Sequence, residues 1–95
     1  MLFLVISTPA PTPPSSVREK RQRYWEWVQP LRDNGTVRAI YARVGRGAVA
    51  LFDVDTLETL HRRLNEWSDI IPAEFEVHPL LDVDAARAFL AQPAT

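Results

Sequence analysis

Apolar and polar positions along the chain follow first the period of a strand and then the period of a helix. Residues 2–7 are a short apolar run of the kind that forms β-strands, and they end at residues 8–14, where four prolines fix an extended connector. In Val17–Asp33, apolar residues recur at positions 17, 24, 28 and 31, which is typical of an amphipathic helix. The first third of the chain therefore predicts a strand, a connector and a helix.

Both ends of this helix carry recognisable signals. Ser15 and Ser16 precede it, and we expect them to accept hydrogen bonds from the free amides of its first turn. Pro30 should kink the last turn or end its regular hydrogen bonding, because proline has no amide hydrogen. Asn34 and Gly35 follow, and a glycine in the left-handed conformation closes many helices.

The middle of the chain predicts a β-hairpin. Thr36–Arg43 and Ala48–Asp53 are strand-like runs, and the four residues between them include Gly45 and Gly47, which suit a tight turn. Counting by two places Val37, Ala39, Tyr41 and Arg43 on one face of the first strand, with Arg38, Ile40 and Ala42 on the other.

The last third repeats the alternation of helix and strand. Asp55 and Glu58 have the spacing of a capping box, and a helix should follow, with apolar residues at positions 57, 60, 64 and 67. Glu74–Leu80 alternates as a fourth strand, and Asp84–Leu90 predicts a short terminal helix.

The resulting order, βαββαβ with a C-terminal helix, is the split βαβ pattern of a ferredoxin-like α+β fold. We expect one domain over residues 1–95, because a chain of this length supports a single core. Both helices would cover one face of the antiparallel sheet. A second copy is the natural cover for the other face, as in a dimeric α/β barrel, so we expect a homodimer or a higher homo-oligomer.

Composition narrows the function classes. The chain has no cysteine, which excludes disulfides and thiolate metal sites and fits a cytoplasmic location. Its formal net charge of −1 gives no field that would attract nucleic acid, and no stretch approaches the roughly 18 apolar residues of a membrane span. Two distant histidines and scattered carboxylates lack the spacing of metal ligands, so we expect no metal site.

Several short segments resemble muconolactone isomerases in order and spacing. They are Met1-Leu2-Phe3, Asn34-Gly35-Thr36 followed by Arg38, and Phe52-Asp53-Val54 followed by Leu60-His61. The resemblance covers residues 1–80. It implies a ferredoxin-like fold, dimers formed through the sheets, and proton transfer on an unsaturated lactone without metal or cofactor.

One departure from that family bears on the substrate. Where the family would carry an acidic residue on the inner face of the first helix, this chain has Tyr24. Glu26 lies about 200° further around the helix and cannot replace it. The resemblance therefore implies a relative adapted to another small ring, such as a lactone-like or aromatic polyketide-derived one.

Isomerisation next to a carbonyl requires a base, a donor to the enolate oxygen and a dry pocket. Tyr24 and Tyr41 are candidate donors, although each could equally be a core ring with a wet hydroxyl. Glu76 and His78 share one face of the fourth strand and are a candidate acid/base pair, unless that face meets solvent.

Candidate substrate-binding residues complete the set. Arg38 or Arg43 could anchor a carboxylate or carbonyl of the substrate, and Trp25 could form a flat wall for a planar ring. Trp25 and Trp27 cannot face the same way on one helix, so one should be core and the other at a pocket mouth or dimer contact. The basic run at positions 18, 20, 21 and 23 is interpreted as a solvated helix face.

These residues leave three functional hypotheses open. The first is a cofactor-independent isomerase or cyclase, with a small molecule as its partner. The second, by fold analogy alone, is a cofactor-free oxygenase. The third is a non-catalytic domain for small-molecule binding or assembly, which the missing helix acid favours.

Overall fold

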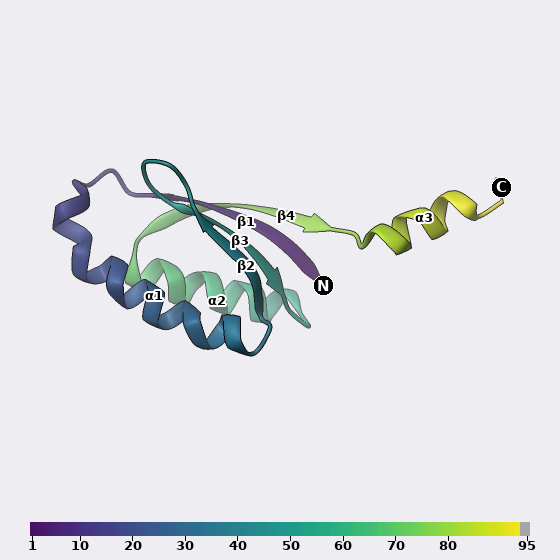
Figure 1. Cartoon of the computed structure of the whole chain (residues 1–95), viewed down its shortest axis with the longest axis horizontal. Helices are drawn as coiled ribbons and strands as arrows, with labels where there is room; N and C mark the ends of the chain where they lie inside the picture. Colours follow the sequence, from purple (N-terminus) through teal and green to yellow (C-terminus); the bar gives the residue numbers. More distant parts are fainter. Residues whose placement is uncertain (94–95) are drawn as a thin grey trace.

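The computed structural model describes residues 1–93 and has one four-stranded sheet with two helices packed on it (Figure 1). The elements are β1 (Leu2–Pro9), η1 (Pro14–Val17), α1 (Arg18–Asp33), β2 (Val37–Ala42), β3 (Ala48–Asp53), α2 (Leu57–Ile70), β4 (Ala73–Leu80) and α3 (Val83–Ala91). This order confirms the predicted ferredoxin-like α+β class.

The strands lie in the order β2-β3-β1-β4, and every neighbouring pair is antiparallel. Helices α1 and α2 run side by side across one face of the sheet (Figure 1). In the described chain the opposite face, here called the open face, carries no helix. The functional residues are therefore sorted by which face of a strand they occupy.

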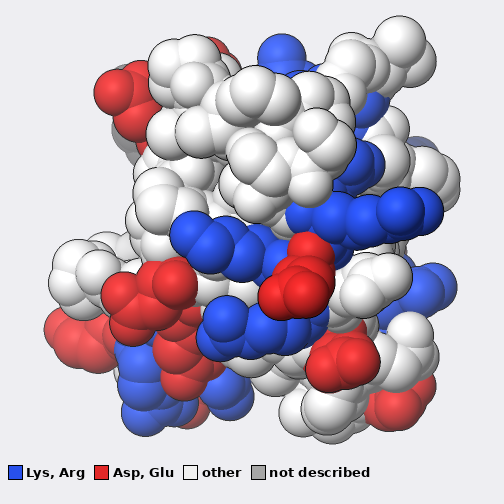
Figure 2. Space-filling view, turned by 90° about the vertical axis from the view of Figure 1, so that its left-hand side faces the viewer, with Lys and Arg blue, Asp and Glu red and all other residues white. Residues whose placement is uncertain are grey.

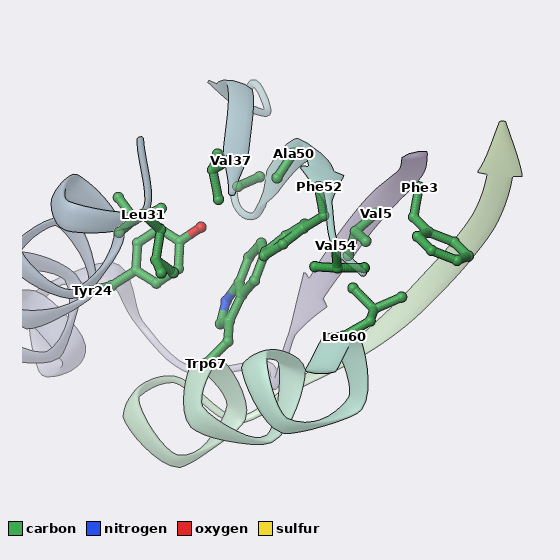
Figure 3. Packing of buried hydrophobic residues seen from close by; sticks show 12 residues of the cluster. Phe3, Val5, Tyr24, Leu31, Val37, Ala50, Phe52, Val54, Leu60 and Trp67 are labelled. Carbon is green, nitrogen blue, oxygen red and sulfur yellow. The ribbon is translucent and has the colours of Figure 1, made fainter. Parts of the chain in front are cut away.

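Alternation along β1 and β3 builds the core between sheet and helices. Phe3 and Val5 on β1, and Ala50 and Phe52 on β3, are buried and point toward the helices (Figure 3). From the helices, the core receives Tyr24, Val28, Leu31, Leu60 and Trp67. Burying each large apolar side chain stabilises the fold by roughly 1.5–3 kcal/mol.

The helix ends differ in detail from the sequence expectations. Neither serine caps α1, and the Ser16 hydroxyl instead donates to the carbonyl oxygen of Pro13, the residue before η1. The N-cap of α2 is Thr56, whose hydroxyl accepts from the amide of Thr59, and not Asp55. A threonine cap gives the same kind of hydrogen bond one position later.

Helix α1 runs through Pro30 to Asp33. The Asn34 amide donates to the Pro30 carbonyl, and Gly35 has a φ of 85°, so the helix closes on the predicted left-handed glycine. Pro30 therefore stays within the helix, since only its own amide hydrogen is lost.

A break in the pairing of β2 makes the counting by two wrong for its first residues. Val37 pairs with Phe52 and Ala39 with Leu51, so Arg38 is an extra residue of the bulge type. Val37 is consequently buried on the helix side, whereas Ala39 and Tyr41 lie on the open face.

Helix α3 projects away from the rest of the fold, and none of its residues is buried (Figure 1). No helix in residues 1–93 combines the length and apolar character that crossing a membrane requires.

Candidate functional site

A pocket of about 70 Å³ opens at the end of the molecule where the β2–β3 hairpin approaches α1 and the end of α2. It lies on the helix side of the sheet and is partly open to solvent. Its lining comes from six elements, the hairpin turn and the α2–β4 connection: Ser7, Pro9, Arg21, Tyr24, Trp25, Ala42, Arg43, Gly45, Arg46, Gly47, Ala48, Trp67, Ile71 and Ala73.

The hairpin reaches this position because Gly47 lies against β1. Its φ is 99°, and a Cβ atom there would come within 2.4 Å of the Ser7 carbonyl oxygen. Ser7 fixes the same approach, because its buried hydroxyl accepts from the Ala48 amide at 2.9 Å. Glycine thus allows the close contact that forms one wall of the pocket.

Tyr24 is the inward-facing residue of α1 at the pocket. Its side chain is only 4% exposed, and within residues 1–93 its hydroxyl has no hydrogen-bond partner. Burial raises the pKa of Tyr24 far above its usual range, because the charged phenolate would lose its hydration. The hydroxyl points from α1 toward the sheet in Figure 3. It therefore stays protonated, and its hydrogen-bond donor is unused.

Aromatic rings surround Tyr24. Its ring centroid lies 4.8 Å from Trp67 and 5.2 Å from Trp25, the latter edge-on. Trp25 is 43% exposed at the pocket, whereas Trp27 is half-buried and its indole Nε1 donates to the Glu66 carboxylate on α2. The two tryptophans of α1 thus divide between pocket and core, as their spacing predicts.

Arg43 also lies at this pocket. Its Nη1 donates to the Ser7 carbonyl at 2.9 Å and to the Thr8 hydroxyl at 3.2 Å. The structure therefore brings together three of the predicted site residues: Tyr24, Trp25 and Arg43.

The other predicted residues lie elsewhere. Glu76 and His78 are neighbours, with the His78 Nε2 3.3 Å from the Glu76 Oε2, but they pair with Ile6 and Leu4 on the open face. Tyr41 occupies the opposite edge of the same face and is 71% exposed. All three are separated from the pocket by the sheet.

Arg38 is engaged in an ion pair. Its Nη2 lies 2.5 Å from the Asp53 Oδ2 on β3, and the N-terminal amine is also near this carboxylate. The Arg38 guanidinium, by hydrogen bonding and by charge, holds the pKa of Asp53 below its ordinary value. This pair does not line the pocket.

Sequence reasoning missed Arg21 and Arg46 as pocket residues. Arg21 precedes Tyr24 by three positions, a spacing that places two helix residues on one side, and this signal was available. Arg46 stands between two glycines of a turn, and nothing in the sequence says toward which neighbour that turn folds.

The sequence matches the model of one protein family. A family model described as a domain of unknown function, DUF3303, matches residues 1–94. The chain belongs to this family. Among curated proteins, none matches the sequence significantly.

Two solved structures are similar to the chain. A muconolactone isomerase has 27% sequence identity and a TM-score of 0.68, with 86% of this chain and 90% of that one covered. A 5-chloro-2-hydroxyhydroquinone dehydrochlorinase (TftG) from Burkholderia phenoliruptrix AC1100, in complex with 2,5-dihydroxybenzoquinone, has 12% identity and a TM-score of 0.74. The alignment covers 90% of this chain and 98% of that one. The DUF3303 chain thus has the muconolactone isomerase-like fold that its sequence motifs predict.

Proposed function

We propose that this chain is a cofactor-independent enzyme of the isomerase or lyase type, acting on a small unsaturated ring in the pocket lined by Tyr24, Trp25 and Arg43. The observation that carries the proposal is the buried Tyr24 hydroxyl without a partner beside a partly open pocket. Leaving such a group unpaired costs roughly 1–3 kcal/mol, and functional sites are where such costs are retained.

The similar structures support the reaction class. One is a muconolactone isomerase and the other a dehydrochlorinase, and the names of both describe changes to small molecules. At 27% identity, the first supports chemistry on a small ring without fixing the substrate.

The pocket residues suggest how such a reaction would proceed. Tyr24 donates its hydroxyl hydrogen to the substrate carbonyl, which becomes an enolate oxygen as the neighbouring C–H loses its proton. Arg43, which lines the same pocket, adds positive potential that favours the developing charge. Because the described lining has no carboxylate or imidazole, solvent water at the open side of the pocket accepts this proton, and the resulting hydronium returns one to another ring carbon, which moves the double bond.

A second candidate is a small-molecule-binding domain without catalysis. It is favoured by one observation: among the described residues, the pocket lining includes no Asp, Glu or His that could act as a general base. The candidates Glu76, His78 and Tyr41 stay predictions, located across the sheet from this pocket.

We further propose that the domain, residues 1–95, works as a homodimer or larger homo-oligomer. The open face carries half-buried apolar side chains in its two central strands, among them Leu4, Ile6, Val49 and Leu51. A second copy packed on this face would remove them from water.

Proton exchange in heavy water tests the enzymatic proposal. The protein is incubated with muconolactone, related butenolides and ring-forming polyketide mimics, and deuterium incorporation is followed by NMR. We expect exchange above the rate without protein, reduced about tenfold or more in Tyr24→Phe, because one oxyanion donor contributes at least this much. Arg62→Gln, an exposed change on α2, should keep the rate. Ligand binding without exchange across the panel would favour the binding domain.

A further inference from the structure

Three arginines surround the mouth of the pocket and come from two different elements. Arg21 lies on α1, while Arg43 and Arg46 belong to the β2–β3 hairpin. In the part of the chain that the structure describes, none of the three forms a salt bridge, in contrast to Arg38 and Arg63. The lining also lacks any Asp or Glu, so the charged side chains that line the pocket are all basic.

This charge is visible on the surface of the molecule. Figure 2 views the end that carries the start of α1 and the hairpin, and basic side chains gather side by side across it. One acidic side chain lies among them near the centre of the view, and others lie below and toward the edges. The chain as a whole has a net charge of −1, so the positive charge at this end is local.

Hydrogen bonds to β1 and to the connector hold two of these guanidinium groups in place. Arg43 uses its Nη1 to reach the Ser7 carbonyl and the Thr8 hydroxyl, and the Arg46 Nη1 donates to the Thr12 carbonyl at 2.7 Å. A guanidinium has five N–H donors, and these contacts occupy one nitrogen of each. The remaining donors are free to bind an acceptor, and their positions are fixed beforehand, which lowers the entropic cost of binding.

The inner part of the pocket has a different character. The Tyr24 ring lies against both Trp25 and Trp67, with centroid separations of 5.2 Å and 4.8 Å. Aromatic walls favour a flat ligand, and the pocket volume of about 70 Å³ favours a small one.

From these observations we infer that the pocket selects a small planar anion: a single ring whose carboxylate or ionised hydroxyl binds Arg43 and Arg46, with Arg21 adding to the positive potential. A polar oxygen elsewhere on the ring accepts from Tyr24. The inference rests on the proposed function in that both use the same pocket, but it concerns binding and needs no turnover. It narrows the substrate class to single-ring anions and disfavours neutral or multi-ring compounds.

The test compares a matched pair of probes, benzoate and neutral benzamide, by tryptophan fluorescence titration of the full chain. We expect benzoate to bind about tenfold more tightly or better, because hydrogen bonds between a guanidinium and a carboxylate are roughly twice as strong as those between neutral groups. Arg43→Gln and Arg46→Gln should each remove most of this preference, and added salt should weaken benzoate binding. Arg62→Gln removes the same charge at a site outside the pocket, so this control should keep the preference for benzoate.

Equal affinity for the two probes, no binding of benzoate, or an unchanged preference in Arg46→Gln would overturn the inference. Arg46→Gln controls for misfolding, because the side-chain hydrogen bond that Arg46 forms within residues 1–93 is to the exposed connector, at the Thr12 carbonyl. The two proposals fail separately. Selective benzoate binding without deuterium exchange removes the enzymatic proposal alone, whereas exchange without charge preference removes the anion inference alone.

Discussion

At the scale of single residues, Tyr24 lowers the stability of the fold and is also the proposed hydrogen-bond donor to the substrate. Its hydroxyl is buried without a partner, so replacing Tyr24 with phenylalanine should raise the free energy of unfolding by about 1 kcal/mol. Urea denaturation measures this change. Tyr41→Phe, at an exposed site, should shift stability by less than about 0.5 kcal/mol. A clear loss of stability in Tyr24→Phe would mean that the hydroxyl already has a partner.

Asp53 gives the fold a dependence on acid. Its hydrogen bond with Arg38 comes first among the causes that lower its pKa, and the charges of Arg38 and the N-terminal amine add to it. Because the folded pKa lies below the unfolded one, the ionised carboxylate stabilises the fold above the unfolded pKa. This contribution is lost as pH falls through the folded pKa.

In Arg38→Gln, the pKa of Asp53 should therefore rise toward its ordinary value, and the protein should lose less stability on acidification. A carboxyl NMR titration of both proteins measures the midpoint. An unchanged midpoint in Arg38→Gln would show that the ion pair is not formed in solution.

At the scale of elements, the β2–β3 hairpin depends on the close approach of Gly47 to β1. Gly47→Ala should destabilise the protein by about 2 kcal/mol or more, since it adds a clash with the Ser7 carbonyl to the strain of a positive φ. Gly45→Ala is the matched control, because its φ is 96° with open space around it, and it should cost about 1 kcal/mol. Equal losses of stability in the two variants would contradict the proposed contact.

Periodicity predicts the elements well and their contacts poorly. Ala48–Asp53 is found as predicted, and α2 follows from its four spaced apolar residues, because each segment has one buried face that dictates its pattern. The bulge at Arg38 produces no such pattern in the sequence. It depends on which residue of β3 pairs with which residue of β2, and that is decided by tertiary packing.

The candidate site likewise contains residues that the sequence could predict and residues that it could not. Tyr24 could be predicted to face inward, since it lies in the apolar series of α1. Arg46 could not, because its place depends on a hairpin folding over a connector about 34 residues earlier in the chain. Glu76 and His78 were correctly placed on one strand face, but only the register with β1 shows that this face is opposite to the pocket.

At the scale of the whole molecule, a single copy leaves apolar surface without cover. The radius of gyration is 15.8 Å, compared with about 12 Å for a compact chain of this length, because α3 projects from the body. A helix of nine residues is marginal alone, and α3 exposes Val83, Phe89 and Leu90. Both α3 and the open face therefore favour association with a second copy.

Sedimentation analysis should show a dimer or larger species that Leu51→Arg converts to monomer. Leu51 lies in the centre of the open face, paired with Leu4 and Ala39, so a charge there would be buried in the interface. Leu57→Arg, at a residue 60% exposed on α2, should keep the assembly. A monomeric wild-type protein would contradict the prediction, and urea denaturation of both variants separates dissociation from unfolding.

The central claim is that small ring compounds bind between the hairpin, α1 and α2, on the helix side of the sheet. NMR shift mapping with muconolactone and benzoate tests it most directly. We expect shifts of the Trp25 and Trp67 indole signals and of the Gly45 and Gly47 amide signals, with the signals of Glu76 and His78 unaffected. Shifts confined to Glu76, His78 and their neighbours on the open face would contradict it and place the site on the other side of the sheet.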